Sequence, residues 1–279
     1  MVISMGLRDS RYIFSVMKEI VEISEEAITN ANKQKLLSPE GNNRYGDATI
    51  YADKIAENIA LRILRKNFGS FILLSEELGL VKVGCISNGD PVFILDPLDG
   101  STNFKRSIPY YSISLAYTEF KNNMKLSDIK LGIVKELSGS KRFYHAIKNT
   151  GAWLNLNTRL KPSETAELEK ALIEVNPVMT GKPEIVDSLN PLLKKVFDIR
   201  RLGSASLTMC NVADGTIDAA IDIRRKLRIV DVAAAYLIAK EAGVAISMED
   251  YPINLETRVN FVMAATPELL NSILFLLQK

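Results

Sequence analysis

The sequence has few of the residues that build several common kinds of site. Its 279 residues include only two cysteines, Cys85 and Cys210, and one histidine, His145. Two cysteines so far apart indicate neither a disulfide framework nor a thiolate metal site, so we expect two free thiols. No Gly-x-Ser-x-Gly motif accompanies the histidine, which argues against a Ser-His-Asp hydrolase and favours a structural or surface role for His145.

Strong charge and long apolar runs are also lacking. The formal net charge is +2 and there is no extended basic block, so electrostatics give no argument for nucleic-acid or membrane binding. No apolar run approaches the roughly 18 residues that span a bilayer, and residues 1–10 lack the apolar segment of a signal peptide. We therefore expect a cytoplasmic protein whose partners include neither nucleic acid nor a membrane.

The chain does have enough apolar residues for a sizeable core, since 47% of its 279 residues are hydrophobic. Apolar spacing predicts helices at about 7–35 and from Asp53 onward. Strands are predicted at 71–75, 92–95, 112–120, 129–136 and 142–147, the last three in an antiparallel sheet. Beyond residue 170, strands at 171–175, 197–202, 216–221 and 258–265 alternate with helices at 204–213, 230–242 and 269–277, which is typical of a more α/β-like half. The charged segment from Lys161 to Lys170 is the predicted boundary between an N-terminal half, residues 1–160, and a C-terminal half, residues 161–279.

The most informative stretch is Asp-Pro-Leu-Asp-Gly-Ser-Thr-Asn-Phe, residues 96–104, which follows the apolar run 92–95. Pro97 has a fixed φ and no backbone donor, so the chain is expected to leave the strand in a rigid turn that holds Asp96 and Asp99. Gly100 permits a close backbone approach, and the three polar residues after it are good N-caps for a helix. Two carboxylates, a hydroxyl and the amides of a helix start favour a divalent cation beside a phosphoryl group. An isolated Asp-x-x-Asp is, however, usually only a polar loop.

This nine-residue word closely resembles the signature of the inositol monophosphatase superfamily of metal-dependent phosphatases. A second segment, Val-Asp-Val-Ala-Ala-Ala at 230–235, is similar to the Trp-Asp-x-Ala-Ala-Gly signature of many members and keeps the metal-binding acid, Asp231. The resemblance covers most of the chain. It implies an α+β fold, a layered α-β-α-β-α sandwich of the sugar-phosphatase type, and a homodimer.

The resemblance also assigns roles to acids whose own context is ambiguous. Asp47 precedes Asp53 by six residues, as in family members, where the first acid of the pair lies beside the metals; alone, Asp47 would be an exposed turn acid. Asp53 could simply favour the start of a helix. Glu76 and Glu77 follow the strand 71–75, and Glu76 corresponds to a metal ligand with Glu77 as support.

Five acids are thus expected to converge, and without cations they would repel one another. Two like charges at about 4 Å repel by roughly 4 kcal/mol at an effective dielectric of about 20. Because the ligands are oxygens, with no histidine or cysteine, they favour Mg²⁺ over Zn²⁺. The resemblance implies two or three Mg²⁺ ions held by Glu76, Asp96, the Leu98 carbonyl, Asp99 and Asp231. It also implies a water oriented by Glu76 and Ser101 with Asp47 nearby, and a phosphate held by the amides of Gly100 and Ser101.

Two further segments predict the substrate side of the site. The segment 201–204 matches a substrate-side segment of the family, and Asp222 stands near the acid that recognises sugar hydroxyls in relatives. The substrate-binding residues expected from the resemblance are therefore Asp99, Arg201, Gly203, Ser204 and Asp222. Residues 224–229 contain four basic side chains. They form either a solvated surface loop or, through Arg225 and Lys226, a clamp for a second phosphate.

The run 222–231 resembles archaeal enzymes that hydrolyse both fructose 1,6-bisphosphate and inositol 1-phosphate. We therefore predict Mg²⁺-dependent hydrolysis of these two small phosphorylated substrates by metal-activated water. The alternatives are a 3′-phosphoadenosine 5′-phosphate phosphatase or a histidinol-phosphate phosphatase of the same superfamily, or a metal-binding regulatory member without activity. Ser101 replaces the threonine common in the family but keeps its hydroxyl, which favours an active enzyme.

Overall fold

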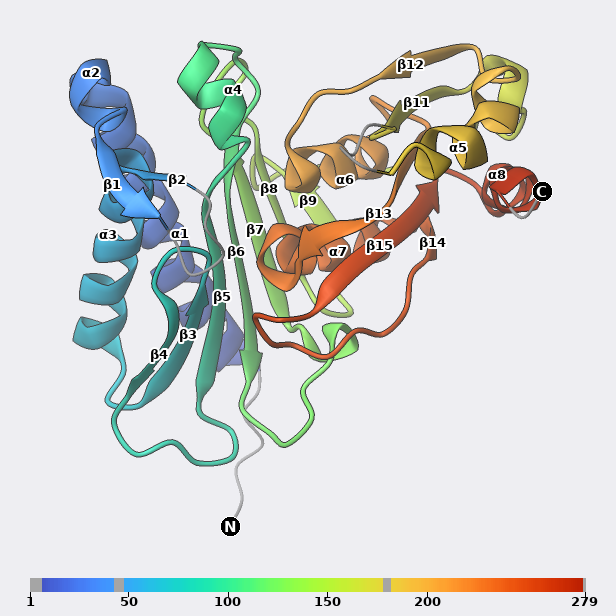
Figure 1. Cartoon of the computed structure of the whole chain (residues 1–279). Helices are drawn as coiled ribbons and strands as arrows, with labels where there is room; N and C mark the ends of the chain where they lie inside the picture. Colours follow the sequence, from blue (N-terminus) through green and yellow to red (C-terminus); the bar gives the residue numbers. More distant parts are fainter. Residues whose placement is uncertain (1–6, 43–47, 178–181, 278–279) are drawn as a thin grey trace.

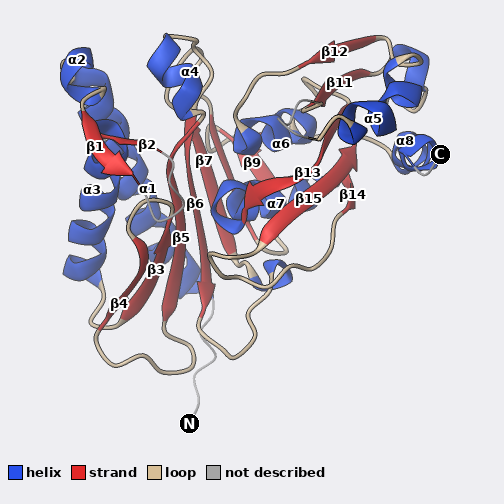
Figure 2. Cartoon of the chain, viewed as in Figure 1, coloured by secondary structure: helices blue, strands red, loops and turns tan. Residues whose placement is uncertain are grey.

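The computed structural model describes residues 7–42, 48–177 and 182–277, which form five alternating layers of helices and sheets (Figure 1). The outer layer is α1 (Leu7–Asn30) with α3 (Tyr51–Asn67), and it covers one face of a large sheet. On the other face lie α6 (Ala205–Ala213) and α7 (Ile229–Ala242), then a second sheet, then α5 (Glu184–Leu193) and α8 (Pro267–Leu277). Figure 2 shows the same layers by element type. The expected α-β-α-β-α sandwich and the α+β class are confirmed.

The strand order of the large sheet brings two acids, Glu76 and Asp96, close together. Its eight strands follow the order β10-β9-β8-β7-β6-β5-β3-β4, and only β3 and β5 pair in parallel. The carboxyl end of β3, at Ser75, therefore lies beside Leu95 of β5, and β5 continues beyond it to Asp99. The strand bounds are β3 (Phe71–Ser75), β4 (Gly79–Val83), β5 (Pro91–Asp99), β6 (Ser112–Glu119), β7 (Leu131–Glu136), β8 (Phe143–Ile147), β9 (Ala152–Leu154) and β10 (Thr158–Arg159).

The second sheet has five strands in the order β12-β11-β13-β15-β14. Its strand β11 runs parallel to β12 and β13, while β15 is antiparallel to β13 and β14. Their bounds are β11 (Leu172–Val175), β12 (Asp198–Arg200), β13 (Ala219–Arg228), β14 (Ala245–Ser247) and β15 (Arg258–Ala264). The remaining elements are α2 (Lys33–Leu36), the β1 (Pro39–Asn42) and β2 (Ala48–Ile50) pair, α4 (Ser101–Arg106), and the short 3₁₀ helices η1 (Leu126–Asp128) and η2 (Leu168–Lys170).

The α7 helix is buried between the two sheets, and its sequence explains why. From Ile229 to Ala239 the helix itself has mostly small and branched apolar residues, and they lie on all of its faces. A helix with neighbours on both sides requires such a sequence. One apolar cluster joins α6, α7 and the facing sides of both sheets. The first turn of α7 is therefore held rigidly against the large sheet, which fixes the place of Asp231.

Several elements differ from the sequence-based expectations. The helix predicted over 7–35 ends at Asn30, because Asn32 caps a separate helix α2 and accepts a hydrogen bond from the Gln34 N–H at 2.8 Å. Neither the strand β4 nor the helix α5 was expected. The strand expected to end at residue 221 continues as β13 to Arg228, since β15 pairs with it along that length.

His145 lies in β8 and has the expected structural role. Its ring packs against Phe14 and Phe143, with centroid distances of 5.0 and 5.5 Å. Burial lowers its pKa to about 4, so the ring is neutral at pH 7. Within the described part of the chain, no helix is both long and apolar enough to cross a bilayer.

Candidate functional site

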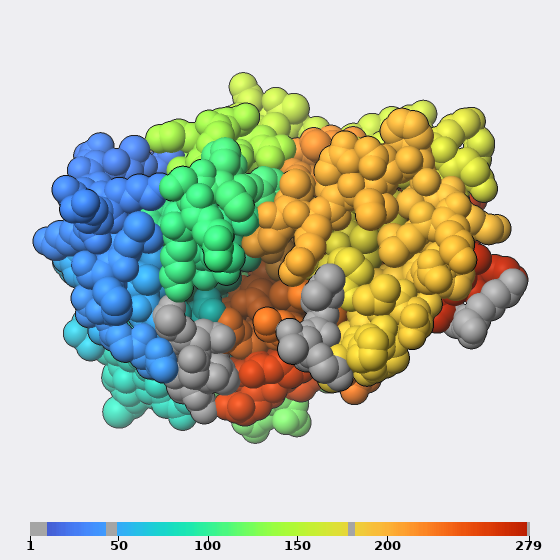
Figure 3. Space-filling model, turned by 45° about the horizontal axis from the view of Figure 1, so that its top comes forward, coloured from blue at the N-terminus to red at the C-terminus, as the bar shows by residue number. Residues whose placement is uncertain are grey.

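The end of β3, the part of β5 around Asp96 and the start of α7 meet beside a cavity of about 490 Å³. The Glu76 N–H, just after β3, donates to the Leu95 carbonyl of β5 at 3.3 Å, so Glu76 and Asp96 follow neighbouring strand positions. The first turn of α7 brings Asp231 from far along the chain. Figure 3 shows the recess between the green segment near residue 100 and the orange segment near residue 225.

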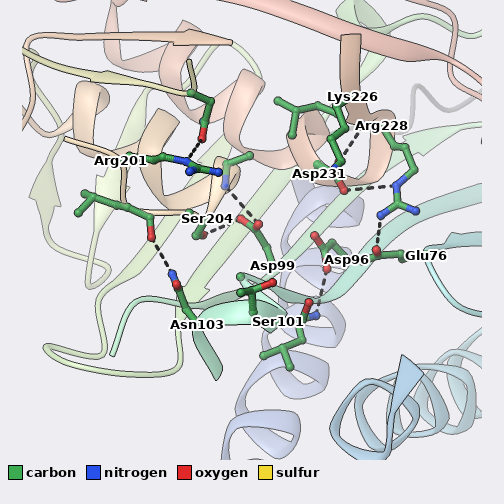
Figure 4. A pocket seen from close by; sticks show the side chains of 18 of the residues that line it. Glu76, Asp96, Asp99, Ser101, Asn103, Arg201, Ser204, Lys226, Arg228 and Asp231 are labelled. Atoms are coloured by element: carbon green, nitrogen blue, oxygen red, sulfur yellow. Dashed lines mark hydrogen bonds and ion pairs between the residues drawn. The ribbon is translucent and has the colours of Figure 1, made fainter. Parts of the chain in front are cut away.

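The side chains of these three acids point toward one another (Figure 4). Glu76, Asp96 and Asp231 each offer a carboxylate oxygen, and the three oxygens lie within 4.8 Å of one another. We call these residues the acid cluster. Burial, and then the charge of Asp231, raises the pKa of Glu76 to about 8, while burial raises the pKa of Asp231 to about 6. The Asp96 pKa is also raised well above its usual value, by burial and then by Glu76. Ionising all three together is unfavourable unless a cation joins them.

Asp99 was expected in the same set, but the structure turns its carboxylate toward α6. Asp99 Oδ2 accepts hydrogen bonds from the Ser206 N–H at 2.7 Å and the Ser204 hydroxyl at 2.6 Å. Asp99 Oδ1 accepts one from the Ala205 N–H at 3.1 Å. The amides and hydroxyls at the start of α6 thus compete for this carboxylate. Asp99 lines the cavity without joining the acid cluster, and its role as a metal ligand stays a prediction.

The turn after Asp96 also differs from the expectation. The chain does not leave the sheet at Asp96: β5 stays paired with β6 as far as Asp99, with an irregular register between the two acids. Asp96 Oδ1 accepts a hydrogen bond from the Leu98 N–H at 3.0 Å, which orients its carboxylate. Gly100, with φ of 94°, is the N-cap of α4 in place of the polar residues after it. A Cβ there would lie 3.0 Å from the Tyr110 carbonyl oxygen, so the turn requires glycine.

The other expected phosphate-side and substrate-side residues fall into two groups. Those that line the cavity are Leu98, Gly100, Ser101, Arg201, Gly203, Ser204 and Lys226. Asp222 and Arg225 are not among the lining residues. Asp222 is 1% exposed and accepts a hydrogen bond from Arg224 Nε at 3.0 Å. The exposed Arg225 donates its N–H to Asn260 Oδ1 at 2.6 Å.

The basic segment 224–229 is not the surface loop that was one of the two expectations. Leu227 and Arg228 pair with Val259 and Arg258 of β15, after an irregular register beyond Asp222. Three of its four basic side chains, Arg224, Lys226 and Arg228, line the cavity together with Leu227.

Sequence reasoning missed the contact between Arg228 and the acid cluster. The Arg228 guanidinium hydrogen-bonds Glu76 Oε1, and its Nε lies 3.9 Å from Asp231 Oδ1. The only sequence feature that could have indicated this contact is that Arg228 lies three residues before Asp231. Asn103 was missed as well: its side-chain amide donates to the Leu202 carbonyl at 2.6 Å, which joins α4 to the 201–204 segment.

Two further acids, Asp53 and Glu77, do not belong to the acid cluster. Asp47 lies outside the described residues. Asp53 Oδ2 accepts a hydrogen bond from the Ile50 N–H at 2.9 Å, so Asp53 caps the first turn of α3. Glu77 accepts a hydrogen bond from the Thr49 hydroxyl, a contact that supports the turn beside Glu76. The site therefore joins a buried acid cluster, suited to a hard divalent cation, to a cavity with arginine and lysine side chains, suited to an anionic ligand.

Comparisons with known proteins match almost the whole chain. The profile of the inositol monophosphatase family matches residues 9–274. The chain is 34% identical over 261 residues to the "Fructose-1,6-bisphosphatase/inositol-1-monophosphatase" of Methanocaldococcus jannaschii, covering 92% of this chain and 95% of that protein. It is 32% identical to the "Bifunctional NADP phosphatase/NAD kinase" of the same organism, covering 76% of this chain and 40% of that protein. A crystal structure described as an inositol monophosphatase-fructose 1,6-bisphosphatase superposes with a TM-score of 0.77 at 31% identity, covering 94% of this chain and 98% of the other.

Proposed function

Because the chain belongs to the inositol monophosphatase family of metal-dependent phosphatases, we propose that it hydrolyses fructose 1,6-bisphosphate and inositol 1-phosphate with Mg²⁺. The observation that supports this most is the acid cluster at the wall of a cavity that also carries Arg201 and Lys226. The acids are suited to the metal, and the basic side chains to the phosphorylated substrate.

The donor set of the acid cluster fits Mg²⁺. Three buried carboxylates with oxygens within 4.8 Å of one another provide hard ligands and up to three negative charges, whereas Zn²⁺ sites favour His and Cys. Glu76, Asp96 and Asp231 would hold the metal, and with the Leu98 carbonyl and Asp99 they form the wider set that we propose for two or three ions. When bound, Mg²⁺ supplies positive charge that lowers the pKa of a water and offsets charge on the phosphate and on the departing oxygen.

The chain's own groups would position water and substrate. We propose that Glu76 and the Ser101 hydroxyl orient the attacking water, with Asp47 nearby. The backbone amides of Gly100 and Ser101 would hold the phosphate. On the sugar side we propose Asp99, Arg201, Gly203 and Ser204, which line the cavity. Asp222, which is not among the lining residues, would act indirectly by orienting the Arg224 side chain.

The two substrates differ in the number of phosphates that basic side chains must bind. Fructose 1,6-bisphosphate carries a second phosphate, which needs a cationic partner, whereas inositol 1-phosphate does not. Lys226 and Arg201 line the cavity, and we propose that they contact this second phosphate. Since Arg225 does not line the cavity, we now assign the clamp to Lys226 with Arg201 rather than to Arg225 with Lys226.

A second candidate substrate is NADP. The likeness to a protein named NADP phosphatase/NAD kinase extends over 76% of this chain at 32% identity, and the 2′-phosphate of NADP is also a phosphomonoester. The same site would therefore accept it without a change in chemistry. We further propose that the protein is cytoplasmic and that, as the family resemblance implies, it is a homodimer.

Phosphate release from a substrate panel tests this proposal. The panel comprises fructose 1,6-bisphosphate, inositol 1-phosphate, NADP, 3′-phosphoadenosine 5′-phosphate and histidinol phosphate, each with Mg²⁺ and with a chelator. We expect the first two to be hydrolysed fastest, and only with Mg²⁺. Mg²⁺ binding without phosphate release from any of them would identify a regulatory member instead.

Single substitutions in the acid cluster test the role of its residues. Asp96→Asn and Asp231→Asn each remove a charge and a ligand while keeping side-chain size, so we expect turnover to fall at least about 1,000-fold, or about 4 kcal/mol of transition-state stabilisation. Circular dichroism would verify that both variants are folded. Near-normal turnover in either variant would refute the assignment of that acid to the metal.

A further inference from the structure

Arg228 lies where β13 passes into α7 and reaches into the acid cluster (Figure 4). Its guanidinium contacts Glu76 Oε1, and its Nε lies 3.9 Å from Asp231 Oδ1. The two side chains in the Glu76 contact are only 13% and 16% exposed. Water therefore screens this ion pair much less than a surface pair.

The contact lowers the repulsion within the acid cluster. Three ionised carboxylates with oxygens within 4.8 Å of one another repel strongly in a buried place. Arginine stays protonated at every relevant pH, so the Arg228 guanidinium offers a permanent positive charge to Glu76 and Asp231. It stabilises the cluster in the absence of a metal.

The same contact opposes the binding of a metal. A carboxylate oxygen that accepts a guanidinium N–H and also binds a dication brings two positive charges close together, which is unfavourable. Mg²⁺ also demands nearly ideal octahedral geometry, and a guanidinium beside Glu76 Oε1 occupies space next to that ligand atom. Filling the site therefore requires the Arg228 side chain to leave Glu76.

Two contacts of the Arg228 backbone do not involve its side chain. Its N–H donates to Asp231 Oδ2 at 2.7 Å, and residue 228 pairs with residue 258 through the β13–β15 ladder. Both features survive a change of side chain. The electrostatic role of the guanidinium can therefore be tested separately from the start of α7.

We propose that Arg228 is a tethered counter-ion that competes with Mg²⁺ for Glu76 and so sets the Mg²⁺ concentration at which the site fills. This inference rests on the proposed function in one respect, that the acid cluster is a Mg²⁺ site. It adds a residue that acts against metal binding and keeps the acids together until the metal arrives.

Calorimetric titration of the metal-free protein with Mg²⁺, without substrate, tests the competition. For Arg228→Gln we expect a dissociation constant about tenfold lower than that of the wild type, which corresponds to about 1.4 kcal/mol. The melting temperature in chelator should fall, and the rise on adding Mg²⁺ should be larger than in the wild type. A merely structural role would weaken Mg²⁺ binding instead.

Arg224→Gln is the matched control, because Arg224 lines the same cavity and carries the same charge but pairs with Asp222. Its Mg²⁺ dissociation constant should stay within about twofold of the wild type, because its guanidinium pairs with Asp222 rather than with Glu76. Equal tightening in both variants would show a general field effect and overturn the proposal. Arg228→Lys, which keeps the charge but loses the planar fork, should fall between wild type and Arg228→Gln, and it decides the question if the glutamine variant does not fold.

The possible failures are distinguishable. If the wild type binds Mg²⁺ and Arg228→Gln binds it equally or more weakly, the counter-ion role is refuted and the metal site remains. If neither protein binds Mg²⁺, the proposed function fails and this inference fails with it.

Discussion

Glu57 holds the turn that carries Glu76. This α3 side chain is 1% exposed, and its Oε1 accepts hydrogen bonds from the Leu78 N–H at 2.9 Å, the Glu77 N–H at 3.2 Å and the Ser75 hydroxyl. Three donors on one oxygen fix the backbone on both sides of Glu76. A residue that is not among those lining the cavity thus positions a member of the acid cluster.

The buried Glu57 also predicts a pH dependence of stability. Burial raises its pKa from 4.5 to about 7, so the folded state binds a proton more tightly than the unfolded state. Its contribution is fully present below about pH 4.5 and is lost as pH rises through about 7.

Glu57→Gln should remove this dependence, because glutamine resembles the protonated acid. We expect the stability of the variant relative to the wild type to rise by about 2–3 kcal/mol between pH 5 and pH 8. Urea unfolding in chelator at both pH values measures it. A difference in unfolding free energy that does not change with pH would contradict the assignment.

Lys226 and Arg225 are neighbours with different surroundings, which makes them a matched pair. Only Lys226 lines the cavity. We expect Lys226→Ala to raise the KM for fructose 1,6-bisphosphate about tenfold, the loss of one charge-assisted contact, with little change for inositol 1-phosphate. Arg225→Ala should change neither. Equal effects of Lys226→Ala on both substrates would remove Lys226 from the second-phosphate site.

At the scale of elements, close contact between β7 and α7 sets the position of Asp231. A Cβ on Gly132 would lie 2.6 Å from the Ala234 carbonyl oxygen, so glycine lets the helix backbone lie directly on the sheet. This contact brings the first turn of α7 toward the ends of β3 and β5.

Gly132→Ala should therefore destabilise the protein by about 1–3 kcal/mol, the usual cost of overpacking. Gly69→Ala is the control, since a Cβ there would meet nothing within 4 Å. Urea denaturation compares the two variants with the wild type. Equal stability of Gly132→Ala and Gly69→Ala would show that the β7–α7 contact is not tight.

The sequence predicted those elements whose pattern is local. Strands β3 and β6 to β8 have β-favouring residues between polar turns, and α6 and α7 follow clear helical patterns, so their approximate positions were predictable. The end of β13 could not be predicted, because the segment Ile-Arg-Arg-Lys-Leu-Arg has the composition of a charged loop. Its Arg228 pairs with Glu76, 152 residues away in the sequence, and its last residues pair with β15; such contacts between distant residues leave no local pattern.

The residues of the site could be predicted where a sequence signature of the family identifies them. The resemblance placed Glu76, Asp96 and Asp231 in one site, and the structure brings them together. It did not reveal that the start of α6 binds the Asp99 carboxylate or that Arg228 contacts Glu76. Side-chain orientation and ion pairing depend on the packed structure, which a motif does not encode.

At the scale of the whole molecule, the acid cluster joins two parts of the chain. Glu76 and Asp96 lie with the large sheet, while Asp231 lies in the part that carries the second sheet. We propose that residues 1–160 and 161–279 are closely packed halves, because the strands of the large sheet end at Arg159 and those of the second begin at Leu172. The apolar cluster that they share holds the acids in register across the boundary.

The central claim is that a divalent metal binds among these acids, and anomalous diffraction tests it most directly. Mn²⁺ also prefers carboxylate and water oxygens, so crystals grown with Mn²⁺ and measured near the manganese edge would locate the site. We predict an anomalous peak among Glu76, Asp96 and Asp231, with the Arg228 side chain turned away from Glu76. Diffraction from Mn²⁺-saturated crystals that shows no peak among these three side chains would contradict the account.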